Sequence, residues 1–178
     1  MLGAYPENHV MRFWIVKGNP SRNNLDKMLV VGKVEDWVTR KPPRDWAVGD
    51  GVFFWKGAPA LRLVGLGRID ALRGADANGE TWFDLLYMTA SIETPLGIEE
   101  LRSDPVVGTA SFLKAGAAGT VFPLTDAQAE RLLRLVQRNS STRGFARASF
   151  VSAASTLTHC PGACSWAPSR SWAAARSP

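Results

Sequence analysis

The sequence predicts an α+β fold in which a small, strongly curved β-barrel is surrounded by short helices. Two observations carry this prediction: short β-branched and aromatic runs alternate with Gly- and Pro-rich turns, and one clearly amphipathic helix closes the body of the chain. A third is the apolar run 61–69, in which two glycines interrupt a strand pattern. Glycines at such positions indicate tight curvature or a close approach by another backbone, as a small barrel requires.

The elements follow in order from local patterns. The first strand is expected over 12–17, because Pro20 cannot donate to a strand ladder and the residue before a proline prefers extended geometry. The turn 48–51 precedes an aromatic strand. The other elements are expected as a helix over 25–31, strands over 52–55, 61–69 and 81–89, and a helical turn over 97–102. The best helix begins with a capping box at 125–128 and keeps helical spacing to Val136.

Composition divides the chain into three parts. Residues 10–139 read as one folded domain, residues 1–9 as a flexible N-terminus, and residues 140–178 as a disordered basic tail rich in Ser, Ala, Arg and Pro. The formal charge of +5 comes from the C-terminal part, because residues 131–178 hold seven of the 21 Lys and Arg residues and none of the 16 acids. The first 130 residues have 14 basic against 16 acidic side chains, a net charge of −2, so the overall basicity is weak evidence for binding a polyanion.

Targeting signals and membrane segments are not expected. The N-terminus lacks the positive start and apolar core of a signal peptide, and no apolar run reaches membrane-spanning length. Both cysteines, Cys160 and Cys164, lie in the tail, so the body of the protein does not depend on a disulfide. A cytoplasmic protein is the natural expectation.

The sequence offers little for catalysis or for metal binding. His159, Cys160 and Cys164 are three candidate ligands without the usual two-pair spacing, and they lie in the tail. No carboxylate pair, nucleophile elbow or phosphate loop stands out, and Gly65 and Gly67 lack the rest of a dinucleotide fingerprint. We therefore expect a protein without enzymatic activity, metal or cofactor.

Five segments, taken in order, resemble the EVE domain, a PUA-like fold related to YTH domains. They are FWIVKGNP at 13–20, the region of Trp37, VGDGVFFW at 48–55, LVGLGRI at 63–69 and GAAGTVFPLT at 116–125. Together they cover about residues 10–138, the whole predicted body. The pattern Asn-Pro followed by Gly-Asp-x-Val-x-x-Trp is closest in style to the EVE domains found with restriction nucleases.

This resemblance implies a domain that binds modified bases, chiefly modified cytosine in DNA, by flipping the base into an aromatic-lined pocket. YTH relatives hold methyladenine in RNA in a similar way. The chain departs from the family pattern at two places. Phe112 stands at the start of the late segment, with Ala115 and Ala117 where a larger polar residue is common, and the loop after Asn19 lacks a frequent tryptophan. Both departures leave the preferred base open.

The resemblance and the residue types together give a candidate base pocket. Trp37 and Trp55 are expected as stacking walls, because stacking a base on an aromatic ring contributes about 1–3 kcal/mol. The Asn19 amide is expected to contact the base edge, because it both donates and accepts hydrogen bonds. The set is completed by Lys17, Phe112, Gly119 and Thr120. Simpler alternatives stay open: core packing for the tryptophans, turn chemistry before a proline for Asn19, and a helix lead-in for the glycine and threonine.

Cations near this pocket are expected to hold the phosphates that flank the base. Arg40, Lys41 and Arg44 form the dense basic cluster of the body. Arg62 and Arg68 of the glycine-rich strand extend that surface, and Lys56 is a further candidate phosphate contact. A solvated basic loop is the alternative reading.

The sequence thus predicts a non-catalytic domain that binds a modified base in nucleic acid, with DNA favoured over RNA. A separately encoded nuclease is a candidate partner. The alternatives are a reader of modified RNA, or a module of the same fold that binds a protein or a small molecule.

Overall fold

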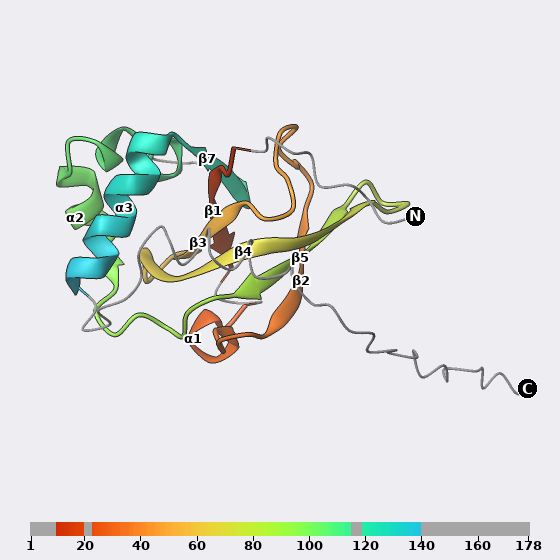
Figure 1. Cartoon of the computed structure of the whole chain (residues 1–178), viewed down its shortest axis with the longest axis horizontal. Coiled ribbons are helices and arrows are strands. Elements are labelled where there is room, and N and C mark those ends of the chain that lie inside the picture. Colours follow the sequence, from red (N-terminus) through yellow and green to blue (C-terminus); the bar gives the residue numbers. More distant parts are fainter. Residues whose placement is uncertain (1–9, 20–22, 115–118, 140–178) are drawn as a thin grey trace, which may run out of the picture.

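The computed structural model describes residues 10–19, 23–114 and 119–139, which form a mixed α+β domain (Figure 1). The strands are β1 (Phe13–Gly18), β2 (Val34–Thr39), β3 (Gly51–Lys56), β4 (Arg62–Ala75), β5 (Thr81–Tyr87), β6 (Leu96–Gly97) and β7 (Val121–Leu124). The helices are α1 (Leu25–Met28), α2 (Ile98–Ser103) and α3 (Asp126–Asn139), with the 3-10 segments η1 (Val107–Thr109) and η2 (Ser111–Leu113) between α2 and β7. The predicted flexible N-terminus, the tail and the candidate metal ligands of that tail lie outside the described residues.

The strands form one sheet in the order β2-β5-β4-β3-β1-β7, and β6 pairs with the start of β4. β1 runs parallel to β3, and the other described pairs are antiparallel. The predicted α+β class is confirmed, but the predicted barrel is not closed: the sheet is strongly twisted, and β2 and β7 are its two edges. Pro123 lies within β7 and has no N–H to donate to a further strand, so this strand is suited to an edge.

The two faces of the sheet carry separate hydrophobic cores, because successive residues of a strand point to opposite faces. On one face, Ile15 and Phe53 pack with buried residues of α2, η1, η2 and α3. On the other, Trp14 and Phe54 pack with Leu25 of α1. Figure 1 shows α2 and α3 together on one side of the sheet and α1 apart from them. We call these the α3 face and the α1 face.

The closing helix begins as the sequence predicts. Thr125 Oγ1 accepts a hydrogen bond from the Gln128 N–H (3.2 Å), and Gln128 Oε1 accepts one from the Thr125 N–H (3.0 Å). This is the reciprocal bonding of a capping box. From there α3 runs to Asn139 with its apolar side in the core of the α3 face. Within the ranges that the structure describes, no helix is long and apolar enough to cross a membrane.

Glycine in β4 is required by a close approach between strands. A Cβ atom added at Gly67 would lie 2.5 Å from the backbone oxygen of Leu86 in β5, closer than real side chains come. The predicted approach of a second backbone is therefore confirmed at this position. Two register shifts follow between residues 69 and 74, and the far end of β4 extends with β5 as a ribbon beyond the rest of the sheet (Figure 1).

A buried carboxylate connects the start of β1 to the turn before β3. Asp50 is fully buried and accepts hydrogen bonds from the backbone N–H groups of Arg12 (3.0 Å) and Ala47 (2.9 Å) and from Trp14 Nε1 (2.8 Å). These bonds form where the parallel β1–β3 pair begins, so they help to fix its register. The turn signal around Asp50 in the sequence therefore marks a structural carboxylate as well as a strand start.

Candidate functional site

A pocket of about 400 Å³ lies where the end of β2 meets the segment leading into β7. We call it the edge pocket, because these two strands are the edges of the sheet. The described residues that line it are Val38, Thr39, Arg40, Lys41, Glu80, Gly119 and Thr120. Four of the predicted site residues, namely Arg40, Lys41, Gly119 and Thr120, are therefore brought together from two segments that are far apart in the sequence.

The turn between β4 and β5 holds Glu80 at this pocket. The carboxylate of Asp76 accepts hydrogen bonds from the N–H groups of Asn78 (2.8 Å) and Glu80 (2.9 Å) and from Trp82 Nε1 (3.2 Å). These bonds, led by the one from the Glu80 N–H, hold the pKa of Asp76 below its usual value. Across the pocket wall, Arg40 Nε donates to Glu80 Oε1 (3.1 Å). The described lining thus carries two cations and one carboxylate.

β1 ends beside the edge pocket. The Lys17 N–H donates to the carbonyl of Thr120 (2.7 Å), and Lys17 Nζ lies 5.2 Å from the centre of the Phe122 ring. Phe122 belongs to the core of the α3 face, and burial lowers the pKa of Lys17. Asn19 is exposed, and its carbonyl accepts a hydrogen bond from the Asn23 N–H (2.7 Å). Lys17 therefore adjoins the pocket through Thr120, and neither Lys17 nor Asn19 is among the described lining residues.

Trp37 belongs to the core rather than to a pocket wall. Its side chain is 4% exposed, its ring centre lies 5.8 Å from that of Phe54, and its Nε1 donates to the hydroxyl of Tyr87 (3.2 Å). Burial raises the pKa of Tyr87 to about 12, so this phenol is neutral at physiological pH. The next residue, Val38, lines the edge pocket, but the indole itself packs on the α1 face.

Trp55 and Phe112 lie in the other core. Trp55 is 1% exposed, and its ring meets that of Phe112 edge to face at 5.2 Å on the α3 face. The prediction that Trp37 and Trp55 face each other across one pocket is wrong. Residues of β3 alternate between faces, so Phe54 meets Trp37 on the α1 face and Trp55 points the opposite way. No aromatic ring is among the described residues that line the edge pocket.

The remaining predicted phosphate contacts are separate from the edge pocket. Lys56 and Arg62 face each other across the β3–β4 pair, and both form ion pairs with Asp26 of α1, Arg62 at 3.9 Å. Their charge is therefore partly neutralised within the fold. Arg44 is exposed in the loop after β2 and does not line the pocket.

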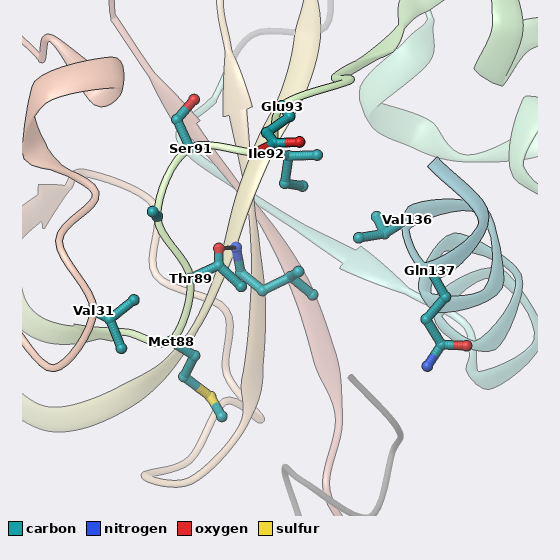
Figure 2. Close-up of a pocket in the computed structure, with 10 residues that line it drawn as sticks. Val31, Met88, Thr89, Ser91, Ile92, Glu93, Val136 and Gln137 are labelled. Atoms are coloured by element: carbon teal, nitrogen blue, oxygen red, sulfur yellow. Dashed lines mark hydrogen bonds between the residues drawn. The ribbon is translucent and has the colours of Figure 1, made fainter. Parts of the chain in front are cut away.

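A second pocket, of about 290 Å³, lies between the loop after β5 and α3. Figure 2 shows Val136 and Gln137 of α3 on one side and the loop from Thr89 to Glu93 on the other. Thr89 Oγ1 fixes this loop to β4 by accepting the Leu66 N–H (2.9 Å). The described lining is mostly apolar and contains Glu93 but neither Lys nor Arg, so it does not suit a phosphate. The sequence does not predict this pocket, because its residues come from the loop after β5, from β4 and α3, and from the turn at Val31.

Comparison of the sequence with protein-family models and with curated proteins finds no match. Solved structures do resemble the fold. A hypothetical protein from Leishmania major is 16% identical with a TM-score of 0.61, over 72% of this chain and 96% of that chain. A protein from Pseudomonas syringae is 18% identical with a TM-score of 0.59, over 70% and 99%. The ASCH protein from Zymomonas mobilis is 14% identical with a TM-score of 0.51, over 70% and 95%.

These likenesses define the class of the fold. The twisted sheet with few short helices is shared with the ASCH protein from Zymomonas mobilis, and this likeness is one of fold. The fold is therefore consistent with the PUA-like fold that the sequence predicts, whereas membership of the EVE family is not confirmed, because no family model matches the chain. At these identities the neighbours establish architecture alone, and function has to be argued from the site.

Proposed function

We propose that this protein is a non-catalytic nucleic-acid-binding domain of the EVE type, and that the edge pocket receives a base extruded from the strand. One observation carries the proposal: two sequence segments that were predicted to contact nucleic acid converge on the same pocket of about 400 Å³. A pocket of this volume is within the usual range for a small-molecule site, and a single base is such a ligand. Enzymes and readers that act on a base take it out of the stack in this way.

Lys41 supplies the contact to the backbone of the strand. It is exposed at the rim of the pocket, where a phosphate beside an extruded base would lie. In the segment leading into β7, Gly119 lines the pocket without a side chain and has a φ of +141°, a conformation that favours glycine, so a base can approach this backbone closely.

The group that stacks on the extruded base has to differ from the two tryptophans that the sequence predicts. Since Trp37 and Trp55 are both buried, the guanidinium plane of Arg40 is the described group best placed to stack on a base. Arginine planes serve this purpose in single-stranded recognition. The proposal therefore keeps an extruded base but replaces the aromatic walls with an arginine held by Glu80.

The choice of modified cytosine in DNA rests on the family resemblance, as does a separately encoded nuclease as partner. A reader of modified RNA uses the same pocket and is the first alternative. The second is a module that binds a protein or a small molecule, and the apolar pocket of Figure 2 is the observation that favours it.

A binding panel tests the proposal. The full chain is titrated with strands that carry plain cytosine, 5-methylcytosine, 5-hydroxymethylcytosine or N6-methyladenine, each as DNA and as RNA. We expect one modified strand to bind more tightly than its plain counterpart. Equal affinity for all modified and plain strands would overturn the proposal.

The same panel tests the contact between Lys41 and the phosphate backbone of the nucleic acid. Lys41→Ala is expected to weaken binding to all strands about equally and to reduce the slope of log K against log salt by about 1, as the loss of one phosphate contact does. Arg138→Ala, which removes an exposed cation from the last turn of α3, is the matched control and should leave the slope almost unchanged. A similar drop in slope for both variants would mean that Lys41 acts only through the overall charge.

A further inference from the structure

Glu80 is the one carboxylate among the described residues that line the edge pocket, and the turn before β5 positions its backbone. Its backbone N–H is bound by Asp76, and its side chain is 26% exposed at the pocket wall. Arg40 Nε engages Oε1 at 3.1 Å. A carboxylate in ionised form only accepts hydrogen bonds, so the Glu80 side chain presents an acceptor at this wall.

The Arg40–Glu80 ion pair contributes little to the stability of the fold. The side chain of Arg40 is 82% exposed, and ion pairs at such positions contribute about 0–1 kcal/mol. The pair also places a negative charge in a pocket that is otherwise suited to a polyanion. Because this ion pair is weak, the carboxylate remains available to a ligand of the pocket.

The neighbouring groups complete a donor and acceptor pattern. Thr39 is buried, and its Oγ1 accepts the Lys41 N–H (3.3 Å), which leaves the hydroxyl hydrogen to be donated elsewhere. Arg40 and Lys41 add further donors. Among the described side chains of the pocket, the Glu80 carboxylate thus only accepts, Arg40 and Lys41 only donate, and the hydroxyls of Thr39 and Thr120 can do either. Cytosine and adenine present the complementary edge, an amino group next to a ring nitrogen that accepts, whereas thymine and uracil present an oxygen where the amino group would be.

We propose that Glu80 determines specificity in the edge pocket by accepting a hydrogen bond from the exocyclic amino group of the bound base. This inference rests on the proposed function, because it assumes that the pocket takes a base. An oxo group at the same place would face the carboxylate and be repelled. Glu80 therefore selects for cytosine or adenine against thymine or uracil.

The test compares 5-methylcytosine with thymine, which share the C5 methyl group and differ in the amino or oxo group at C4. Each is placed opposite an abasic position in otherwise identical DNA duplexes, so that extrusion is easy in both. We expect the full-length protein to bind the 5-methylcytosine duplex about tenfold more tightly, the size of one good base-edge pair. In Glu80→Gln, whose amide can donate to the thymine oxygen, this ratio should fall to near one. Glu99→Gln, which removes an exposed carboxylate from α2, is the control that should keep it.

The outcomes separate the two proposals. If the 5-methylcytosine-to-thymine ratio survives in Glu80→Gln, Glu80 does not read the amino group. Glu80→Ala is a second variant, which should lower the affinity for 5-methylcytosine without raising that for thymine, and an unchanged affinity contradicts the inference as well. Thermal unfolding of each variant confirms that the fold is intact. Binding of 5-methylcytosine against plain cytosine is measured in parallel in the wild type. Equal affinities there contradict the reading of a modification, whereas the 5-methylcytosine-to-thymine ratio tests Glu80 separately.

Discussion

Replacing Trp55 with alanine is expected to lower the free energy of unfolding by about 3–5 kcal/mol, as large aromatic truncations in cores do. The side chain is 1% exposed and packs edge to face on Phe112 in the core between the sheet and α3. Because the ring lies away from the edge pocket, molecules that remain folded should keep any preference between modified and plain bases. Denaturant unfolding measures the first effect, and binding below the unfolding transition measures the second.

Trp55→Phe is the matched control. It keeps a ring at the same position and should lose much less stability, because a smaller volume is removed. If Trp55→Ala abolished discrimination while leaving stability unchanged, Trp55 would be a wall of the binding site, and its placement in the core would be wrong.

Replacing Asp50 with alanine is expected to cost about 3 kcal/mol or more, although the residue lies in a turn. The change would leave three donors without their acceptor: the N–H groups of Arg12 and Ala47 and the indole of Trp14. Hydrogen bonds to a charged group contribute about 1.5–3 kcal/mol each, and buried donors without partners are costly. The measurement is again the midpoint and slope of denaturant unfolding.

Asp45→Ala is the matched control for the stability loss in Asp50→Ala. Asp45 lies in the same loop and forms an ion pair with Arg12 at 2.7 Å, but its side chain is 66% exposed. Exposed pairs contribute at most about 1 kcal/mol, so this variant should be nearly as stable as the wild type. Equal losses for the two variants would show that the loop, and not the buried carboxylate, holds the β1–β3 pair.

Local patterns in the sequence predict much of this fold. The capping box of α3 and the close approach at Gly67 are both present as expected. β2 was not recognised, because the run 34–39 mixes two acids with apolar residues and has no clear alternation. The open sheet could not be predicted either, since closure depends on whether two edge strands pair, and these are far apart in the sequence.

The site was predicted in part, and the errors have a physical cause. Every residue from Gly51 to Trp55 in β3 is buried, so hydrophobic alternation cannot tell which face of the sheet Trp55 takes. Only the pairing of the neighbouring strands shows that Trp55 and Trp37 belong to different cores. Glu80 was missed for another reason: its surroundings in the sequence indicate a turn and nothing more, and its chemical role follows from its contact with Arg40.

The central claim is that nucleic acid enters the edge pocket, and mapping the contact tests it most directly. Backbone amide resonances of the full chain are compared with and without a duplex that carries a single 5-methylcytosine opposite an abasic position. We predict that the largest changes fall on residues 38–41, Glu80 and residues 119–120, the described lining of the pocket. Unchanged resonances there, with the main changes around residues 88–93 at the pocket of Figure 2, would contradict the account.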